Sequence, residues 1–419
     1  PGRIGLTRDD LDADFPDNPV MVTHVSMHGA VLNSLALKKY NITAATKTPP
    51  GGIITRKPGS NEPAGLVMEM AYLPIFAALP KPTPAEELSW SRAAQQLYAQ
   101  AGITTAHEGA THASDLALMQ RVSAAGGNQI DIVAYPFITE LDAILKSNPP
   151  SSFGQYNNGL KLGGAKITID GSVQGRTALF TTPYLVEGPN GEKPWKGVAP
   201  FTQQQLNQMV KQVYDLGLPL DLHANGDGAI DMLLAAHEFA AAGDLEKERH
   251  VTAVHSQFVR RDQLDKYRKY KITPSFFTQH TYFFADTHLV LRGKQQTDFI
   301  SPMRTAIDMG LRPSNHTDFV VTPLDQLFVI WTAVNRISRN GVLIGGGERI
   351  TPLEALEAIT LSAARQHGDE QTKGSLEPGK LADMVILSAN PLTVEPMQIK
   401  DIKVVETFKQ GRRIYPQQL

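Results

Sequence analysis

The 419-residue sequence contains no cysteine. Disulfide bonds, thiolate metal sites and a cysteine nucleophile are therefore excluded, which leaves His, Lys, Asp and Glu for any metal chemistry. No apolar run approaches the roughly 18 residues that a membrane-spanning helix needs, and residues 1–15 lack the apolar core of a signal peptide. The absence of cysteine does not fix the compartment. We expect a cytoplasmic protein and leave a signal peptide upstream of Pro1 open.

The sequence also lacks a strong charge of either sign. Its net charge of −2 offers neither a basic surface for nucleic acid nor a polybasic face for anionic lipid. We therefore expect a small-molecule substrate, and neither nucleic acid nor a membrane as a partner. A homodimer is left open as its assembly.

Short runs of β-forming residues alternate with amphipathic helical segments along most of the chain. This alternation is typical of βα units around a parallel sheet and predicts an α/β fold. Three helix starts follow the capping-box pattern, with Thr83, Thr202 and Thr351 as the capping residues. Gly102 and Gly217 follow the first two of these helices, where a C-terminal glycine is expected.

Seven segments are predicted as the parallel strands of these units. They share β-branched or aromatic residues bounded by turn signals. They are residues 102–108, 130–137, 165–171, 218–226, 250–256, 271–279 and 311–318. Since eight strands close a (β/α)8 barrel of the TIM type, the sequence predicts such a barrel with its first strand absent from these 419 residues.

Two regions depart from the βα alternation. Within the barrel, assigned to residues 1–375, an insertion is predicted at about 18–80, with an extended run followed by a short helix at 30–40. Residues 376–419 alternate apolar and polar side chains with glycine turns. This second pattern predicts the C-terminal strands of a small β-sandwich appended to the barrel.

Reactive side chains recur where the predicted strands end. They are His107, Glu108, Lys166, Asp170, His223, His255, His280, His316 and Asp318. Active sites of (β/α)8 barrels lie at the carboxyl ends of the strands, so these side chains would converge on one mouth. Histidines and carboxylates are the ligands that a divalent metal uses in the absence of cysteine, and the pattern therefore predicts a metal site.

Each of these residues also has a structural explanation when it is taken alone. A single strand-end histidine is more often a hydrogen-bonded framework residue than a ligand. Asp318 could cap the helix that begins at residues 323–328, and Lys166 could pair with Asp170 or reach outward between helices. Packing and capping give no reason to place all of them at carboxyl ends of strands, so the joint pattern favours a metal site.

Motifs along essentially the whole chain resemble the amidohydrolase superfamily. They are Lys166-x-x-x-Asp170-Gly-Ser followed by Arg-Thr-Ala, His223 in HANGDGA, His255, Asp318 and the C-terminal KGSLEPGKLADMVILSANP. More narrowly, the chain is similar to the branch that contains N-substituted formamide deformylase and related metal-dependent hydrolases.

The resemblance implies an enzyme that hydrolyses C–N bonds other than peptide bonds. It implies that Lys166 reacts with CO₂ to give a carbamate bridging two metals, and that His223 and His255 are metal ligands. Asp318 would also bind metal and act as general base and acid. Zinc, as one or two ions, is the expected metal.

One departure from the family pattern is the His-x-His pair that ends its first strand. That spacing occurs nowhere in this chain, and His24 and His28, four residues apart in the insertion, do not fit it. We expect the natural protein to continue upstream of Pro1 with strands of the small sandwich and a strand ending in His-x-His. A degenerate, non-catalytic barrel stays open as an alternative. A heterocycle deaminase of the same superfamily is the other, which Lys166 argues against because such an enzyme usually needs no lysine carbamate.

The expected substrate is an amide, a formamide or another N-acyl compound with an apolar substituent. A metal-bound water has its pKa lowered toward about 7 and can attack a planar carbonyl carbon. His280 and Arg176 are the predicted substrate-binding residues, which could hold the developing oxyanion. The aromatic run at 275–286 predicts either packing under the barrel rim or an apolar pocket, and 181–201 is long enough for a lid.

Overall fold

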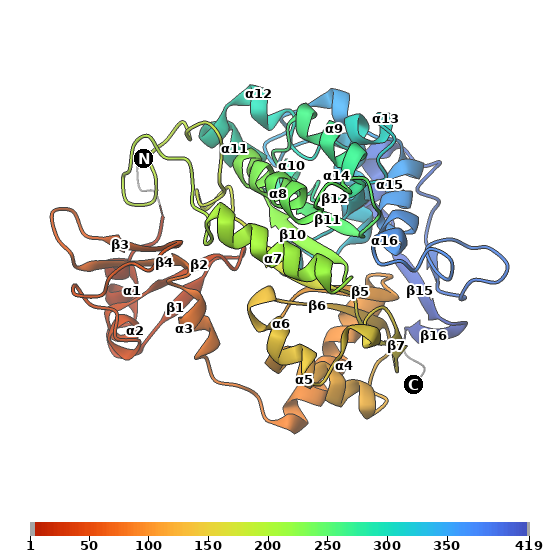
Figure 1. Ribbon diagram of the computed structural model, residues 1–419, viewed down its shortest axis with the longest axis horizontal. Coiled ribbons are helices and arrows are strands. Elements are labelled where there is room, and N and C mark those ends of the chain that lie inside the picture. Colours follow the sequence, from red (N-terminus) through yellow and green to blue (C-terminus); the bar gives the residue numbers. More distant parts are fainter. Residues whose placement is uncertain (1–4, 417–419) are drawn as a thin grey trace.

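The computed structural model describes residues 5–416. Its centre is a parallel sheet with helices packed around it (Figure 1). Five strands lie in the spatial order β13-β12-β11-β10-β9, and every neighbouring pair is parallel. Their bounds are β9 (Ala165–Thr168), β10 (Leu220–Ala224), β11 (Val251–His255), β12 (Ile272–Phe276) and β13 (Ser314–Asn315).

A second group of strands continues this sheet. Its spatial order is β5-β6-β8-β7, with β5, β6 and β8 parallel and β7 antiparallel to β8. The bounds are β5 (Thr105–Thr111), β6 (Asp131–Pro136), β7 (Tyr156–Asn157) and β8 (Leu160–Leu162). A parallel bridge between Phe137 and Lys166 joins the end of β6 to β9. All seven predicted strands are therefore present; six lie within shorter bounds, and β5 is shifted by three residues from the predicted 102–108.

The parallel sheet stays open at one place. Between residues 5 and 416 no strand pairing joins β13 to β5. The α/β class is confirmed, whereas a closed barrel is not formed by these residues. On the β5 side of this gap most residues are partly buried or exposed, whereas β10 and β11 are buried throughout.

Helices connect the strands and cover the outside of the sheet. The longer ones are α4 (Pro84–Gln100), α5 (Ala113–Ala124), α6 (Ile138–Leu145), α7 (Gln203–Asp215), α8 (Asp227–Ala240), α9 (Arg261–Tyr270), α11 (Ala285–Arg292), α14 (Gln326–Asn335) and α15 (Pro352–Ile359). The shorter ones are α10 (His280–Phe283), α12 (Lys294–Thr297), α13 (Met303–Asp308) and α16 (Leu361–Gln366), with 3-10 turns at Pro150–Ser152, Gly346–Glu348 and Pro396–Asp401.

The predicted helix signals are confirmed. Thr83, Thr202 and Thr351 each accept a hydrogen bond from a backbone N–H in the first turn, and each is part of a complete capping box. Gly102 and Gly217 have φ values of +81° and +67°, the left-handed conformation that ends a helix at low steric cost in glycine.

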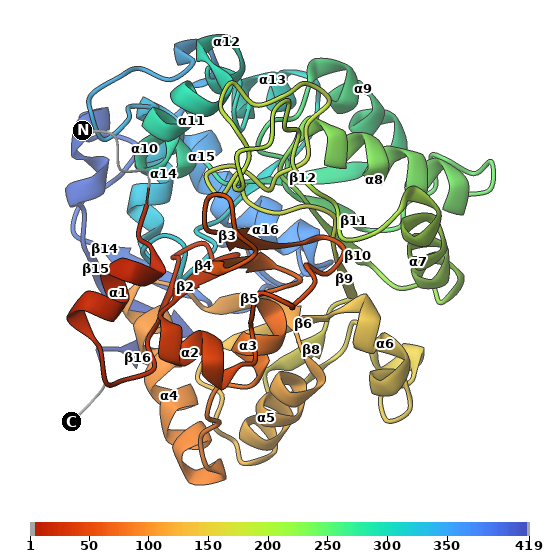
Figure 2. The same ribbon diagram turned by 90° about the vertical axis from the view of Figure 1, so that its left-hand side faces the viewer.

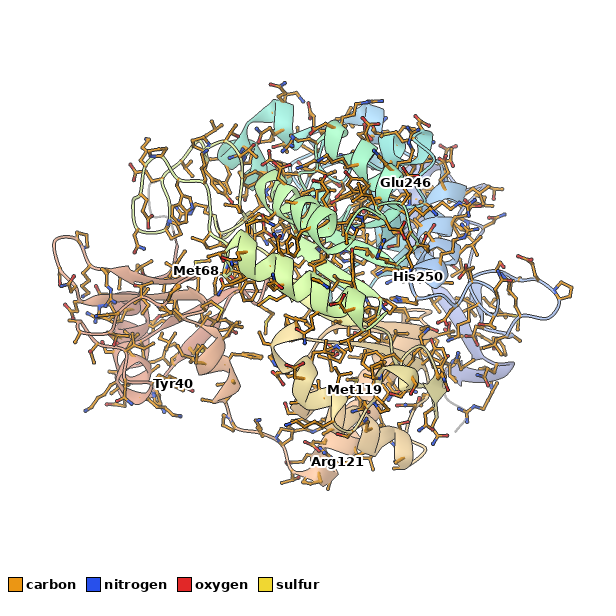
Figure 3. The ribbon with its side chains drawn as sticks, viewed as in Figure 1. Tyr40, Met68, Met119, Arg121, Glu246 and His250 are labelled. Atoms are coloured by element: carbon orange, nitrogen blue, oxygen red, sulfur yellow. The ribbon has the colours of Figure 1, made fainter. Side chains whose placement is uncertain are left out.

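The main core lies between the strands and these helices. Side chains fill the space between the two layers, as Figure 3 shows. Ile167 on β9, Leu222 on β10 and Phe276 on β12 are each 0% exposed. Burying one such side chain fully stabilises the fold by roughly 1.5–3 kcal/mol.

A separate antiparallel sheet precedes the parallel one in the chain. Its spatial order is β1-β2-β4-β3, and it carries its own apolar core, which includes Leu32, Ile54 and Val67. The bounds are α1 (Arg8–Asp14), β1 (Met21–Thr23), β2 (Gly29–Leu32), α2 (Ser34–Lys39), β3 (Gly52–Arg56), β4 (Pro63–Glu69) and α3 (Leu73–Ala77). Figure 2 shows this small sheet in front of the parallel strands.

The predicted helix at 30–40 begins later than expected. Residues 29–32 form strand β2, and α2 starts at Ser34. The reason is Asn33, whose side-chain oxygen accepts a hydrogen bond of 2.9 Å from the backbone N–H of Ala36 and so caps the helix.

The C-terminal segment forms one antiparallel sheet. Its strands are β14 (Met384–Leu387), β15 (Val404–Lys409) and β16 (Arg412–Tyr415), paired in that order. The predicted alternation is confirmed as strands, but up to residue 416 they make a single sheet rather than a sandwich. None of the helices in the described chain is both long enough and apolar enough to cross a bilayer.

Candidate metal centre

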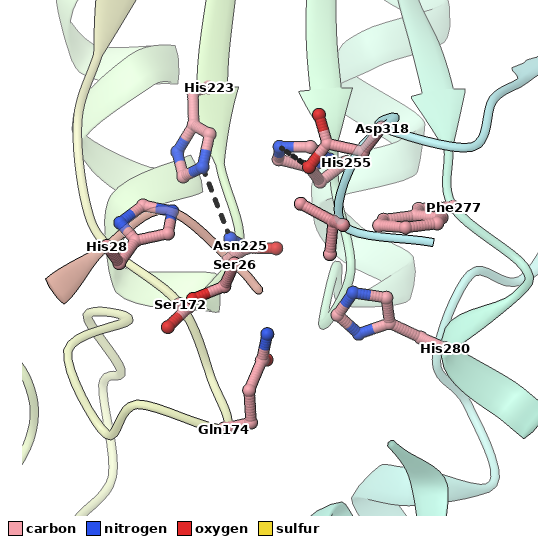
Figure 4. A pocket seen from close by; sticks show the side chains of 11 residues that line it. Ser26, His28, Ser172, Gln174, His223, Asn225, His255, Phe277, His280 and Asp318 are labelled. Atoms are coloured by element: carbon pink, nitrogen blue, oxygen red, sulfur yellow. Dashed lines mark hydrogen bonds and ion pairs between the residues drawn. The ribbon is translucent and has the colours of Figure 1, made fainter. Parts of the chain in front are cut away.

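A polar pocket lies where the strands of the parallel sheet end (Figure 4). Its wall combines residues from the turn between β1 and β2, from the loop after β9, from the ends of β10, β11 and β12, and from the segment after β13. The lining residues are Ser26, His28, Ser172, Gln174, His223, Asn225, His255, Phe277, His280, Asp318 and Val321. The pocket therefore contains four of the six residues that the sequence assigns to the site.

His223 and His255 stand side by side at the ends of neighbouring strands. Their ring centroids are 4.5 Å apart and the ring planes are nearly perpendicular. The parallel register of β10 and β11, which pairs Ala224 with His255, brings them to this position. Both residues are buried, with 6% and 5% of their surfaces exposed.

Asp318 approaches His255 from the segment after β13. Its Oδ2 atom lies 4.0 Å from Nε2 of His255, and its side chain is 44% exposed. The residue is not a helix cap, because Asp325 accepts the capping hydrogen bond of α14 from the Phe328 N–H at 2.9 Å. Asp318 and His255 have φ values of +50° and +70°, a costly conformation for non-glycine residues that clusters at functional sites.

Lys166 is buried on β9 without an ionic partner. It is 6% exposed and lies level with Asp221 of β10, and its Nζ atom makes no hydrogen bond or ion pair with any residue between 5 and 416. Burial lowers the pKa of its ammonium, against the opposing effect of the Asp221 and Asp318 carboxylates. An amine with a lowered pKa is more readily neutral, which is the form that can react with CO₂.

The alternative pairing of Lys166 with Asp170 is wrong. The Asp170 carboxylate is instead bound to backbone N–H groups of Leu179, Asn225 and Gly226, each at 2.9 Å. Burial raises the pKa of Asp170 to about 7, although these three donors favour the charged form. Asp170 therefore organises the loops around the pocket rather than neutralising Lys166.

The two histidines have the protonation state that metal ligation requires. Burial lowers the pKa of His223 to about 3, helped by the nearby positive charges of Lys166 and His28. Burial also places the pKa of His255 well below its usual value. Both rings are therefore neutral at pH 7, as ligands must be.

The donor atoms at the pocket suit a divalent cation in type. Nδ1 of His223 and Nδ1 of His255 are buried and have no hydrogen-bond partner, although the former lies 3.3 Å from Asp170 Oδ1. Unpartnered buried nitrogens are uncommon and call for a ligand or a water. Across residues 5–416, however, no group of three or more His, Asp or Glu side chains is arranged to hold a metal ion. The donor atoms are therefore of the type that a divalent cation binds, and an oxygen donor on Lys166 would add a further ligand.

The two predicted substrate-binding residues have different positions. His280 lines the pocket, and its Nδ1 atom lies 3.0 Å from Nε2 of His288. Arg176, contrary to expectation, is not among the lining residues, since its guanidinium donates to the carbonyl oxygens of Glu187 and Gly188 at 2.9 and 3.3 Å. Arg176 thus anchors the loop after β9.

His28 is the pocket residue that the sequence analysis set aside. Its ring lies 5.6 Å from that of His223, and its Nδ1 atom is 3.0 Å from the Glu69 carboxylate at the end of β4. Glu69 also accepts a hydrogen bond of 2.6 Å from Thr177 in the loop after β9. Burial raises the pKa of Glu69, but His28, the Thr177 hydrogen bond and His223 together bring it below its usual value.

No spacing rule could have placed His28 in the site, because its neighbours are distant in sequence. The only local signal was its position directly before the buried strand β2. Ser26, two residues before His28 in the same turn, also lines the pocket. The aromatic run at 275–286 satisfies both of its interpretations, since Phe277 lines the pocket while Phe276 is in the main core.

Comparison with known proteins shows the family to which the chain belongs. A family model described as the Amidohydrolase family matches residues 1–415. YtcJ of Bacillus subtilis (strain 168) is 27% identical over 433 residues, covering 98% of this chain and 76% of that protein. The N-substituted formamide deformylase of Arthrobacter pascens is 25% identical over 416 residues, covering 97% and 75%.

A solved structure gives the same fold. It is that of an uncharacterized metal-dependent hydrolase from Pyrococcus horikoshii OT3, which superposes with a TM-score of 0.73 at 23% identity and covers 93% of this chain and 75% of that one. The match of the family model over nearly the whole length is decisive for membership. The chain belongs to the amidohydrolase family.

Proposed function

We propose that this protein is a metal-dependent hydrolase that cleaves a C–N bond outside peptides, in an amide, a formamide or another N-acyl compound. The observation that carries the proposal is the pair of buried neutral histidines, His223 and His255, with Asp318 4.0 Å from the second. The similarity to an N-substituted formamide deformylase supports the bond type.

The metal would be held by Lys166, His223, His255 and Asp318, as one or two zinc ions. Lys166 would contribute oxygen donors as a carbamate, formed when its neutral Nζ attacks the carbon of CO₂ and releases a proton. When bound, the metal supplies an acidified water and polarises the carbonyl group of the substrate. The lowered pKa of Lys166 and its lack of an ionic partner support this modification.

Asp318 would be the proton carrier. In the proposed reaction its carboxylate accepts a proton from the attacking water and then donates it to the departing nitrogen. One group can serve in both directions because the second step needs the acid that the first step produces. The exposure of Asp318 toward the pocket gives it access to both water and substrate.

In this proposal, different walls of the pocket contact the acyl group and the substituent of the substrate. His280 would hold the carbonyl oxygen, and Phe277, which also lines the pocket, would offer an apolar surface to the substituent. Ser26, Gln174 and His28 form the polar side opposite. This division favours a small polar acyl group on an apolar amine.

A second candidate is a binding protein with a degenerate site. The observation in its favour is that no group of three His, Asp or Glu ligands for a metal is complete between residues 5 and 416. Such a protein would bind small molecules at the same pocket without turning them over.

Metal content and turnover distinguish the two candidates. The purified protein is treated with zinc and bicarbonate, its bound metal is counted by mass spectrometry, and a panel of N-formyl, N-acyl, carbamate and aminated heterocyclic compounds is assayed. We expect stoichiometric zinc and release of amine from an N-acyl compound. Absence of bound metal together with absence of turnover would establish the degenerate site, and release of ammonia from a heterocycle alone would indicate a deaminase.

A further inference from the structure

His280 and His288 form a buried pair of histidines at the edge of the pocket. His280 begins α10 and His288 lies in α11, with 4% and 0% of their surfaces exposed. Nδ1 of His280 is 3.0 Å from Nε2 of His288, and the rings are stacked with centroids 5.3 Å apart. One of these two nitrogens must carry the hydrogen that the bond shares.

The other nitrogen of His288 decides which one it is. Nδ1 of His288 is buried and has no hydrogen-bond partner among residues 5–416. A hydrogen on that atom would leave a buried N–H unpaired, which proteins rarely tolerate. A hydrogen on Nε2 is instead used in the bond to His280. His288 is therefore the donor, and Nδ1 of His280 is the acceptor.

The surroundings keep both rings uncharged. His288 packs edge-on against Phe258 at 5.4 Å and lies near Phe284 at 6.4 Å. No carboxylate forms an ion pair with either histidine within the described chain. A neutral His280 that accepts at Nδ1 must carry its own hydrogen on Nε2.

That second nitrogen of His280 faces the pocket. Nε2 has no hydrogen-bond partner in the described part of the protein. Unlike Nδ1 of His288, it is not buried away from solvent. Figure 4 shows the imidazole reaching into the pocket beside Phe277. A donor held in place before the substrate arrives stabilises negative charge without reorganisation.

We propose that His288 is a positioning residue that fixes the tautomer of His280, so that His280 presents its Nε2–H to the acyl oxygen of the substrate. The identity of that oxygen rests on the proposed hydrolysis of N-acyl compounds. The tautomer itself does not depend on it.

Two substitutions of His288 test the proposal, with His237 as a matched control. Phe keeps the ring of His288 and removes the donor, whereas Gln keeps an N–H that can reach Nδ1 of His280. His237 is equally buried on α8, but its ring contacts Tyr214 and Tyr270 away from the pocket. The zinc-loaded wild type, His288→Phe, His288→Gln and His237→Phe are compared in kcat and KM, and ¹⁵N NMR of the histidine rings reports the tautomer of His280.

We expect His288→Phe to lower kcat by about 10²-fold with little change in KM, the scale of losing one preorganised donor. His288→Gln should recover most of that loss, and His237→Phe should leave kcat unchanged. A wild-type His280 with its hydrogen on Nδ1, or equal kcat values for His288→Phe and His237→Phe, would overturn the proposal. If the wild type hydrolyses no compound of the panel, the proposed function fails and the NMR spectrum alone decides the tautomer.

Discussion

Lys409 of β15 donates a hydrogen bond of 2.7 Å to the carboxylate of Asp131 at the start of β6. Lys373 donates to the same carboxylate, and Lys409 also reaches Asp383 at 2.6 Å. Lys409, Lys373 and Asp131 are 6–7% exposed. This buried ionic cluster fastens the C-terminal sheet to the parallel sheet.

Removing Lys409 should destabilise the whole protein. We expect Lys409→Met to lower the free energy of unfolding by about 3 kcal/mol, because two buried carboxylates lose a partner. Lys400→Met is the control, since its ion pair with Asp401 is on the surface and such pairs contribute about 0–1 kcal/mol. Urea unfolding of both variants measures the difference, and equal midpoints would contradict the prediction.

Gly171 should be intolerant of any side chain. A Cβ atom at this position would lie 2.1 Å from Glu69 Oε1 and 2.2 Å from Thr177 Oγ1, so Gly171→Ala must break the link that holds Glu69. We expect a loss of about 1–3 kcal/mol of stability together with reduced turnover. Gly347→Ala, where a Cβ would meet nothing within 4 Å, should change neither quantity. The assay is thermal unfolding alongside turnover of the best substrate.

Lys166→Ala should lose bound metal and turnover. The substitution removes the buried side chain that is proposed to become a carbamate. Alanine is neutral, so the substitution introduces no new buried charge. Metal counting and a ¹³C-bicarbonate NMR signal on the wild type check both parts of this expectation. Lys211→Ala, which removes a surface ion pair to Asp215, should bind metal normally. Lys161 is unsuitable as the control, because it is itself buried against Asp369 at 2.6 Å. Full metal binding by Lys166→Ala would contradict the assignment.

Asp318→Asn should reduce kcat by about 10²–10⁴-fold while the fold is kept, because the amide preserves shape and cannot accept the proton. Asp325→Asn is the control, because Asp325 caps α14 and is not a pocket residue. Asparagine caps a helix about as well as aspartate, so both the cap of α14 and kcat should be largely unchanged. Near-normal turnover by Asp318→Asn would remove Asp318 from the reaction.

Stability should fall with acid below the ordinary pKa of histidine. Burial lowers the pKa of His288 to about 3, so between about pH 6.5 and 3 the unfolded chain binds a proton at this residue that the folded protein does not. The free energy of unfolding therefore decreases as the pH falls, by about 1.4 kcal/mol per pH unit for this one residue. His223 and His316, with pKa values also lowered to about 3 by burial, act in the same direction.

Urea midpoints of the wild type and His288→Phe at about pH 7 and about pH 5 measure this slope. The variant should lose stability less steeply than the wild type as the pH is lowered. Parallel slopes for the two proteins would show that His288 is charged in the fold.

The sequence was sufficient for the strands and helix starts because their signals are local. Val251 and Ala253, in the strand that ends at His255, belong to the main core, and the capping box at Thr202 lies within four residues. Strand β8 was not among the predicted strands; it is only three residues long, and Gly163 and Gly164 separate it from β9.

The sequence predicted only those site residues that lie at the ends of the parallel strands. His223, His255 and Asp318 converge because parallel strands end at one edge, which the sequence pattern already implied. His28 and Glu69 depend on how the small sheet docks, and Arg176 on the path of a loop. Neither the docking of the sheet nor the path of the loop follows from local spacing. For that reason the sequence analysis set His28 aside and wrongly assigned Arg176 to substrate binding.

The small sheet has a consequence for how the substrate range of this protein can change. Ser26 and His28 stand on a layer with its own apolar core, built from residues such as Leu32 and Val67. Exchange of side chains on that layer leaves the packing beneath His223 and His255 intact. We therefore expect new specificities to arise, in nature or in the laboratory, by changes at Ser26 and its neighbours on this layer, whereas changes at His28 would also alter His223.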